Sequence, residues 1–320
     1  MISPNESNIQ TVQQSASPAQ HSKPMKTYAD FGLMRSLWQL RFALNERKKA
    51  VNNMSVLFDQ LRQDEIRMEQ TLGKPIENLR ILEIGPGQGM ERSRYLGIKN
   101  DVVGVDLDVI SNGSDFDRYI QMIKVNGFGR FAKSLGRRLL IGQINEAAWI
   151  KAIGSDQYRD PQLIQGDICE CAPETEAFDL VVSWSVFEHL PDPVRALENV
   201  IQAIKPRGGF YIRIHIFTSI NGSHDMRAFT GQEDKLPLWG HLRPTTANQI
   251  FPSSYLNRWR LQQWRQLFAD LAPGTREYLE SYDYHEKYGP LLDQNLRYEL
   301  KDYTDEELFT VDAIYFWQKP

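Results

Sequence analysis

Three glycines and one carboxylate are the first residues in this chain whose types and spacing suggest chemistry. They form the run Glu83-Ile84-Gly85-Pro86-Gly87-Gln88-Gly89, which directly follows the apolar residues Ile81 and Leu82. Glycine tolerates positive φ and lets a ligand approach bare backbone. A helix predicted to begin at Met90 would add free N–H groups and the positive end of its dipole. The run therefore predicts a buried strand, a tight turn and a helix start that hold a nucleotide-like ligand.

Two features of this turn favour a cationic ligand over a dinucleotide. A dinucleotide fingerprint needs a third small residue for close helix–strand packing, and the chain has Met90 there. Glu83 lies two residues before the first glycine, where its charge would repel a diphosphate and attract a cation. A nicotinamide-dependent oxidoreductase or epimerase remains an alternative, although Met90 and Glu83 both disfavour it.

Further apolar runs predict the sheet that positions this turn. Runs ending at Asp106, at Asp167 and at Ser183 read as strands, and the strand–helix–strand unit implies parallel pairing with a right-handed crossover. The carboxyl ends of such strands line a ligand crevice, so these polar residues should face it. The other expected elements are a helix over Pro191–Ala203, a strand over Phe210–Phe217, a helix over Leu256–Leu271, a strand over Tyr278–Tyr284 and a last strand over Thr310–Gln318.

The motifs, taken in order, resemble those of class I S-adenosylmethionine-dependent methyltransferases. The glycine run resembles the first motif of that family, and four later segments resemble its second-, third- and fourth-strand motifs and the turn before strand five. These are Gly104-Val105-Asp106, Gln165-Gly166-Asp167-Ile168, Phe178-Asp179-Leu180-Val181-Val182-Ser183-Trp184-Ser185-Val186-Phe187-Glu188-His189-Leu190 and Lys205-Pro206-Arg207-Gly208-Gly209. The match covers about residues 77–217 and the terminal strand, and five motifs in sequence make it specific.

The resemblance implies a fold, a cofactor and a set of cofactor-binding residues. The fold would be α/β and Rossmann-like, with a doubly wound, seven-stranded, mostly parallel sheet whose last strand is antiparallel. The cofactor would be S-adenosyl-L-methionine. Asp106 would hold the ribose hydroxyls, Asp167 would take the adenine amino group, and Ile168 would pack against the ring. The whole expected cofactor site is Glu83, Gly85, Gly87, Gly89, Asp106, Leu107, Asp167, Ile168 and Ser183.

Histidines are the candidate bases for methyl transfer to an alcohol. The cofactor carries an activated methyl group, so the protein mainly orients and desolvates the reactants, while a hydroxyl acceptor also needs a base. The candidates are His189, His215, His224 and His241, of which His189, His215 and His241 are preferred. Some relatives use a Glu-x-x-Glu-His metal site. Here Ser185 replaces the first Glu, so Glu188 and His189 alone predict no metal.

The class of molecule that accepts the methyl group can be narrowed by excluding other classes. A net charge of -4 argues against general nucleic-acid binding. No Asn-Pro-Pro-Tyr type segment follows strand four and no Pro-Cys pair occurs, which disfavours methylation of nucleic-acid bases. Three segments look similar to glycan-pathway methyltransferases: Gly240-His241-Leu242-Arg243-Pro244, Tyr255-Leu256-Asn257-Arg258 and Tyr303-Thr304-Asp305-Glu306-Glu307-Leu308. We therefore expect O-methylation of a small molecule or saccharide, with a non-catalytic cofactor-binding partner protein as an alternative.

Composition and patterning predict the organisation of the chain. We expect a disordered tail over 1–25, an N-terminal helical extension over 26–75 that packs on the next domain or forms a lid, and a methyltransferase domain over 76–320. Within that domain, 109–160 would be a basic helical insertion and 218–275 the acceptor side. The stretch 118–145 could be a solvated face, a lid or a weak membrane-surface contact. With no transmembrane segment or signal peptide and two cysteines expected as reduced thiols, a cytoplasmic location is predicted; the oligomeric state is not.

Overall fold

The computed structural model describes residues 54–87, 89–107, 149–153, 158–229 and 232–320. Several predicted segments fall elsewhere. The tail over 1–25, the extension as far as residue 53 and the basic stretch 118–145 lie outside the described residues. The proposed division of the chain into 1–25, 26–75 and 76–320 therefore stays a prediction.

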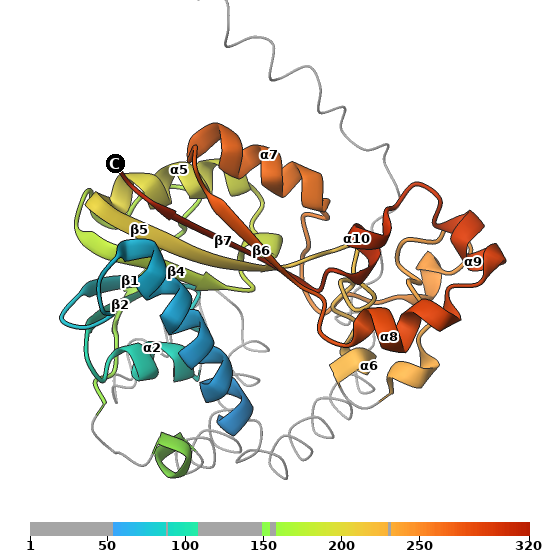
Figure 1. The fold of residues 1–320 in the computed structure, drawn as a ribbon, viewed down its shortest axis with the longest axis horizontal. Coiled ribbons are helices and arrows are strands. Elements are labelled where there is room, and N and C mark those ends of the chain that lie inside the picture. The colour runs from blue at the N-terminus through green and yellow to red at the C-terminus, as the bar shows by residue number, and fades with distance from the viewer. Residues whose placement is uncertain (1–53, 88, 108–148, 154–157, 230–231) are drawn as a thin grey trace, which may run out of the picture.

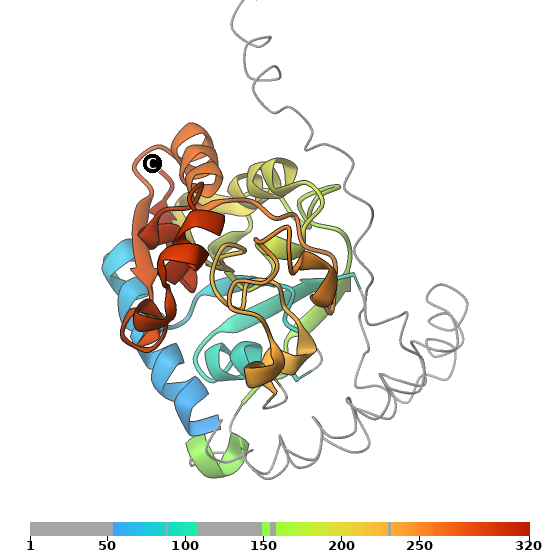
Figure 2. The same cartoon turned by 90° about the vertical axis from the view of Figure 1, so that its right-hand side faces the viewer.

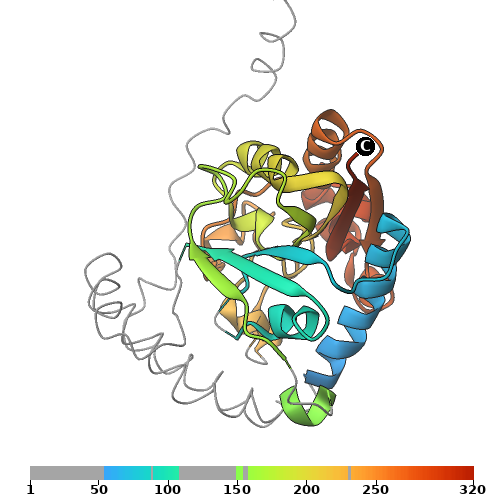
Figure 3. The ribbon, with the colours of Figure 1, turned by 90° about the vertical axis from the view of Figure 1, so that its left-hand side faces the viewer.

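A seven-stranded mixed sheet forms the centre of the molecule, and it confirms the predicted fold class (Figure 1). Its order is β3-β2-β1-β4-β5-β7-β6. Six strands run parallel and β7 runs antiparallel to both of its neighbours. The bounds are β1 Arg80–Ile84, β2 Asp101–Asp106, β3 Gln162–Gln165, β4 Phe178–Trp184, β5 Ile204–His215, β6 Arg276–Glu280 and β7 Asp312–Gln318. Figure 3 shows β2 and β3 at the edge of this sheet.

Helices cover both faces of the sheet, so its central strands are mostly apolar on both sides. On one face α5 (Pro193–Ala203) and α7 (Leu261–Leu271) pack against Leu82 and Phe210. On the other, α2 (Glu91–Leu96) and a helix over 54–72 pack against Ile81 and Tyr211. Alternating residues of one strand therefore enter opposite cores, as in a doubly wound sheet. The part of the N-terminal extension that the structure describes thus packs on the sheet.

Helix α5 illustrates how local sequence sets the element boundaries. Asp192 is its N-cap and accepts a hydrogen bond from the backbone N–H of Arg195 at 3.0 Å, and Pro193 occupies the first turn. A capping box joins Thr304 and Glu307 at the start of α10 (Asp305–Phe309), as the sequence predicts.

Three predicted elements differ clearly from the observed ones at their ends. The strand predicted over Phe210–Phe217 begins six residues earlier, because β5 spans Ile204–His215 and includes the segment predicted as the turn before it. The predicted helix over Leu256–Leu271 begins only at Leu261, because Arg258 has a φ of 61° that interrupts a helix. The predicted strand over Tyr278–Tyr284 lies instead at Arg276–Glu280, because Tyr282 turns the chain with a φ of 47° before α8 (Tyr284–Tyr288) begins. Pattern alone does not reveal such left-handed residues.

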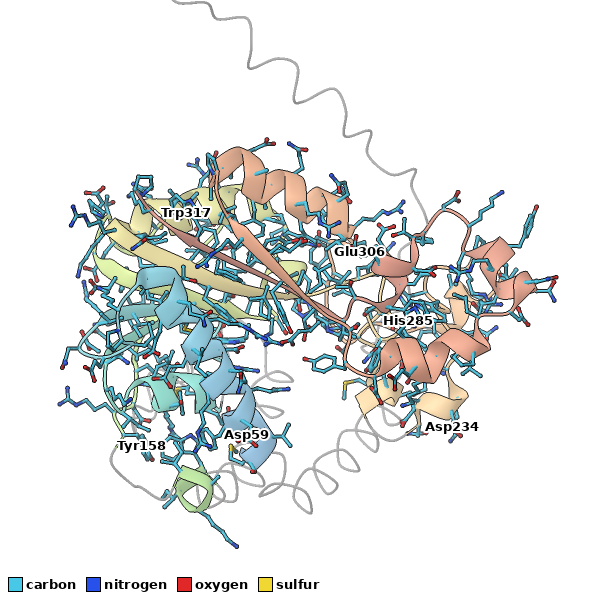
Figure 4. The ribbon with its side chains drawn as sticks, in the orientation of Figure 1. Asp59, Tyr158, Asp234, His285, Glu306 and Trp317 are labelled. Atoms are coloured by element: carbon cyan, nitrogen blue, oxygen red, sulfur yellow. The ribbon has the colours of Figure 1, made fainter. Side chains whose placement is uncertain are left out.

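A smaller group of elements lies beyond the end of β5, at the right of Figure 1. It contains α6 (Met226–Phe229), α8, α9 (Gln294–Glu299), α10 and the short helices η4 (Glu233–Lys235), η5 (Ala247–Gln249) and η6 (Gly289–Leu291). Trp239 and Phe309 lie in its own apolar cluster. Figure 2 looks onto this end of the molecule, and Figure 4 places His285 and Asp234 within it, away from Trp317 in the sheet.

A buried ion network ties the 54–72 helix to three strands. Arg213 on β5 contacts Asp64 at 2.9 Å, Asp312 at 3.1 Å and Glu280 at 2.5 Å. Asp64, which is 2% exposed, also accepts hydrogen bonds from the Tyr211 hydroxyl at 2.6 Å and the indole N–H of a neighbouring tryptophan at 2.8 Å. Such a network fixes the start of β7 relative to the end of β5. No helix among the described residues is both long and apolar enough to span a bilayer.

Candidate active site

The glycine turn after β1 has the predicted conformation and an open backbone. Gly85 and Gly87 both have a φ of 66°, which L side chains rarely adopt. A Cβ atom on Gly85 would come within 2.6 Å of the Val186 side chain, so the segment after β4 closes directly on the turn. A Cβ atom on Gly87 would meet nothing within 4 Å. The turn therefore presents bare backbone toward open space, as a ligand cradle requires.

Glu83 is a buried carboxylate beneath this turn. Its residue is 2% exposed, and the Ser93 hydroxyl on α2 donates a hydrogen bond to it. Burial raises the pKa of Glu83 to about 7, against the opposing hydrogen bond from Ser93 and the charge of Arg92. Burial without a full counter-charge disfavours the ionised form, so a ligand cation would restore it. The charge of Asp106 also acts on Glu83, which places the two predicted acids close together.

The predicted adenosine-side residues follow β2 and β3. Asp106 at the end of β2 pairs in register with Gln165 of β3, so Asp106 and Asp167 project from neighbouring strand ends. Leu107 is 57% exposed and lies beside Asp106. Asp167 accepts a hydrogen bond from the backbone N–H of Cys169 at 2.8 Å, which fixes the turn after β3.

Two other predicted cofactor residues are deeply buried. Ile168 is 4% exposed and joins the apolar core, while Ser183 is fully buried and its hydroxyl lies 3.4 Å from the Ile84 carbonyl. Their side chains support the strand ends. Direct contact of either with a cofactor stays a prediction, as does the role of Gly89.

His215 and Asp312 form a histidine–carboxylate pair at the end of β5. Their Nδ1 and Oδ1 atoms lie 3.2 Å apart, and the antiparallel register places the two residues directly opposite each other. Burial alone would lower the pKa of His215, but the hydrogen bond and charge of Asp312 and the charge of Glu188 raise it above its ordinary value. His215 Nε2 is buried and makes no hydrogen bond of normal geometry with the described residues, although the backbone of Asn221 also acts on the ring and raises its pKa. One nitrogen is thus held by a carboxylate, and the other is the one that could take a proton.

His189 and His224 lie beside this pair. Their rings are 4.8 Å apart between centroids, and the His224 ring is 4.9 Å from that of His215. Burial, followed by the charges of His215 and His189, lowers the pKa of His224 to about 2. Burial also lowers the pKa of His189 below its ordinary value. Glu188 in the short helix η3 (Phe187–His189) is 2% exposed, and burial raises its pKa to about 8.

His241, the third predicted base, is held in a different way. Its Nε2 atom lies 2.7 Å from the Phe217 carbonyl oxygen, and its ring packs edge-on against the Phe217 ring at 5.0 Å. Burial lowers the pKa of His241 to about 4. The structure thus brings His189, His215 and His224 into one cluster and ties His241 to the adjoining backbone.

The family match now identifies the chain. Residues 45–263 match the family described as a methyltransferase domain, which is more than half of the 320 residues. The chain belongs to the methyltransferase family. S-adenosylmethionine is the cofactor, and the nicotinamide alternative is set aside.

Solved structures similar to this methyltransferase are distant from it in sequence. One is an arsenic(III) S-adenosylmethionine methyltransferase from Chlamydomonas reinhardtii, which is 18% identical in sequence. The alignment covers 77% of this chain and 65% of that chain, with a TM-score of 0.41. Another is phosphoethanolamine N-methyltransferase 2 from Haemonchus contortus in complex with S-adenosyl-L-methionine, which is 14% identical in sequence. The alignment covers 81% of this chain and 52% of that chain, with a TM-score of 0.41. A third is the CurJ carbon methyltransferase, which is 15% identical in sequence. The alignment covers 76% of this chain and 49% of that chain, with a TM-score of 0.36. Scores this low carry no argument about the acceptor. No curated protein sequence matches the chain.

Sequence reasoning missed two residues of this methyltransferase site and one grouping of side chains. Asp312 and Ser93 were not expected, because their partners His215 and Glu83 are set by strand register and helix packing. The grouping of His224 with Glu188 and His189 was also not predicted. Its only sequence signal was a histidine shortly after strand five.

Proposed function

We propose that this methyltransferase transfers the methyl group of S-adenosylmethionine to a hydroxyl oxygen of a small molecule or saccharide. Glu83 would face the amino group of the cofactor, Gly85 and Gly87 would give it backbone room, and Asp106 and Asp167 would hold the ribose and adenine. Two observations support this placement: the open space over Gly87 and the buried, incompletely neutralised carboxylate of Glu83.

The observation that carries the choice of a hydroxyl acceptor is the His215–Asp312 pair. A neutral amine attacks through its lone pair and a thiol ionises close to neutral pH, whereas an alcohol is so weak an acid that a base must take its proton as it attacks. In the proposed step the acceptor oxygen attacks the methyl carbon in line, the carbon–sulfur bond breaks, and S-adenosylhomocysteine leaves. The acceptor proton goes to Nε2 of His215, while Asp312 holds Nδ1 and steadies the resulting charge.

The proposed base lies near the cofactor cradle through a short chain of contacts. Val186 touches the Gly85 turn, and Glu188, two residues later, acts electrostatically on His215. The acceptor hydroxyl would approach between the turn after β1 and the end of β5. The 218–275 region, proposed as the acceptor side, begins immediately after this strand.

A His215→Gln variant tests the proposal. We expect turnover with an identified acceptor to fall about 10²- to 10⁴-fold, because one general base is lost. Binding of S-adenosylhomocysteine should stay within about twofold of the original protein, since His215 does not belong to the proposed cofactor cradle. His285→Gln, an exposed histidine on α8, is the matched control and should leave both quantities unchanged.

Two outcomes would count against this assignment. Unchanged turnover in His215→Gln would remove His215 as the base. Tight cofactor binding with no transfer to any acceptor class would favour the alternative of a cofactor-binding partner protein. The cytoplasmic location stays a prediction.

A further inference from the structure

Three side chains near the proposed base form a group with the composition of a metal site. Glu188 and His189 come from η3 after β4, and His224 comes from the segment after β5. One ligand-capable atom from each lies within 4.8 Å of the others. They are brought together by the pairing of β4 with β5, although 35 positions separate His189 from His224 in the numbering.

The carboxylate of Glu188 is the strongest sign that a cation belongs here. Glu188 is 2% exposed, and neither of its oxygens makes a hydrogen bond of normal geometry with any residue that the structure describes. His189 Nε2 lies 4.0 Å from Oε1, and the charge of His215 also acts on Glu188, so the nearby positive charges that the structure describes are those of imidazoles, which must be protonated to carry them. Burying a carboxylate without hydrogen bonds or a counter-ion costs several kcal/mol, so natural proteins rarely leave one unpaired.

His189 is oriented as a metal-binding imidazole would be. Its Nδ1 atom lies 2.7 Å from the Tyr255 carbonyl oxygen and 3.2 Å from the Ser254 hydroxyl. The carbonyl can only accept a hydrogen bond, so Nδ1 carries the proton and Nε2 presents its lone pair toward Glu188. A second hydrogen bond of this kind fixes the tautomer and ring orientation of most metal-bound histidines.

His224 is held against the same backbone segment. The backbone N–H of Ser253 donates to the His224 carbonyl at 3.0 Å, one residue before the segment that orients His189. His224 itself has a φ of 51°, a conformation that costs a non-glycine residue free energy and that clusters at functional sites. The chain from Ser253 to Tyr255 thus orients the His189 imidazole and holds the His224 backbone beside it.

We propose that Glu188, His189 and His224 bind one divalent cation of the first transition row, such as Zn²⁺ or Mn²⁺. Two imidazoles and one carboxylate suit these ions better than Mg²⁺ or Ca²⁺, which prefer oxygen ligands. Ligand atoms around one tetrahedral zinc lie about 3.3 Å apart, so side-chain shifts of about 1 Å would close the present spacing. Three protein ligands leave a coordination position open, beside the His215 ring that packs edge-on against His224.

Cation binding to untagged, chelator-treated protein tests this inference independently of any methyl acceptor. Co²⁺ is the spectroscopic probe, with Zn²⁺, Mn²⁺ and Mg²⁺ compared by calorimetry. We expect one Co²⁺ per chain with visible absorption bands of nitrogen-coordinated cobalt, displacement of Co²⁺ by Zn²⁺, and weaker binding of Mg²⁺. Bound metal should also raise the melting temperature.

Three variants separate this site from adventitious binding. Glu188→Gln, His189→Gln and His224→Ala should each weaken Co²⁺ binding at least tenfold and abolish the metal-dependent rise in melting temperature. His285→Ala, which removes an exposed histidine outside the group, should bind Co²⁺ as the original protein does. Circular dichroism identifies any variant that fails to fold. Absence of stoichiometric binding, or equal binding by the folded variants, would overturn the proposal. The methyl-transfer proposal would survive that result.

Discussion

The buried carboxylate of Glu83 predicts that cofactor binding depends on pH. Its pKa of about 7 means that the unliganded protein carries a largely protonated Glu83 at pH 6. The amino group of the cofactor is a cation, and it should bind best beside the carboxylate form. Binding below pH 7 must then release a proton, so affinity should rise with pH and level off above pH 7.

The size of the effect follows from the pKa. One pKa unit corresponds to a factor of ten in affinity, so S-adenosylhomocysteine should bind about tenfold more weakly at pH 6 than at pH 8. The stability of the unliganded protein should instead fall as the pH rises. The folded-state pKa is raised from 4.5 to about 7, so protonated Glu83 favours the unliganded fold below pH 4.5, and this contribution, about 3 kcal/mol, is lost as the pH rises through 7.

Calorimetry between pH 5.5 and 8, in buffers with different ionisation enthalpies, measures both affinity and proton release. Glu83→Gln is the key variant, because glutamine has the same shape and can still accept the Ser93 hydrogen bond. At pH 8 we expect this variant to be more stable without ligand, to bind S-adenosylhomocysteine more weakly, and to show little pH dependence of binding. Flat affinity in the original protein, or the same pH dependence in Glu83→Gln, would refute the reasoning.

Three further substitutions, two of them with a matched control variant, test the cradle and its support. Gly87→Ala and its control Gly73→Ala impose a similar left-handed strain, with φ values of 66° and 64°, and in neither does the added Cβ atom meet another atom within 4 Å. Each should therefore lower the free energy of unfolding by about 1–2 kcal/mol. Only Gly87→Ala should weaken cofactor binding, as measured by calorimetry. Asp106→Ala should weaken cofactor binding by about 1.5–3 kcal/mol if Asp106 holds the ribose hydroxyls, and unchanged affinity would remove that assignment. Asp64→Ala should lower the free energy of unfolding by about 3 kcal/mol, because it breaks the buried network around Arg213. Asp59→Ala, on the same helix but 69% exposed at its side chain, should change that quantity by less than about 1 kcal/mol in the same denaturant titration.

The fold was predictable because its signals are local. Apolar runs that end at Asp106 and Ser183, the glycine turn after Ile84 and the proline-led start of α5 each depend on neighbouring residues. The order of these motifs then limits the topology, and the observed sheet order confirms it. The ends of α7 and β6 were misplaced because single residues with positive φ, Arg258 and Tyr282, carry no distinctive sequence signal.

The histidine cluster was not predictable in the same way. His215 meets Asp312 because β5 and β7 pair in one particular antiparallel register, which brings together residues that are 97 positions apart. His224 meets His189 through the conformation of a connection rather than through a repeating pattern. The sequence could name the histidines as candidates. It could not show which of them share one site or that His241 is tied to the Phe217 carbonyl.

The most direct test of the central claim is transfer of an isotopically labelled methyl group from S-adenosylmethionine, with the labelled product isolated and its attachment atom determined by NMR. Small molecules and saccharides from a cell lysate supply the acceptors. We predict that the label resides on an oxygen atom, that S-adenosylhomocysteine forms in equal amount, and that His215→Gln labels at least about 10²-fold more slowly while still binding cofactor. Label on nitrogen, carbon or sulfur, or undiminished labelling by His215→Gln, would contradict the account.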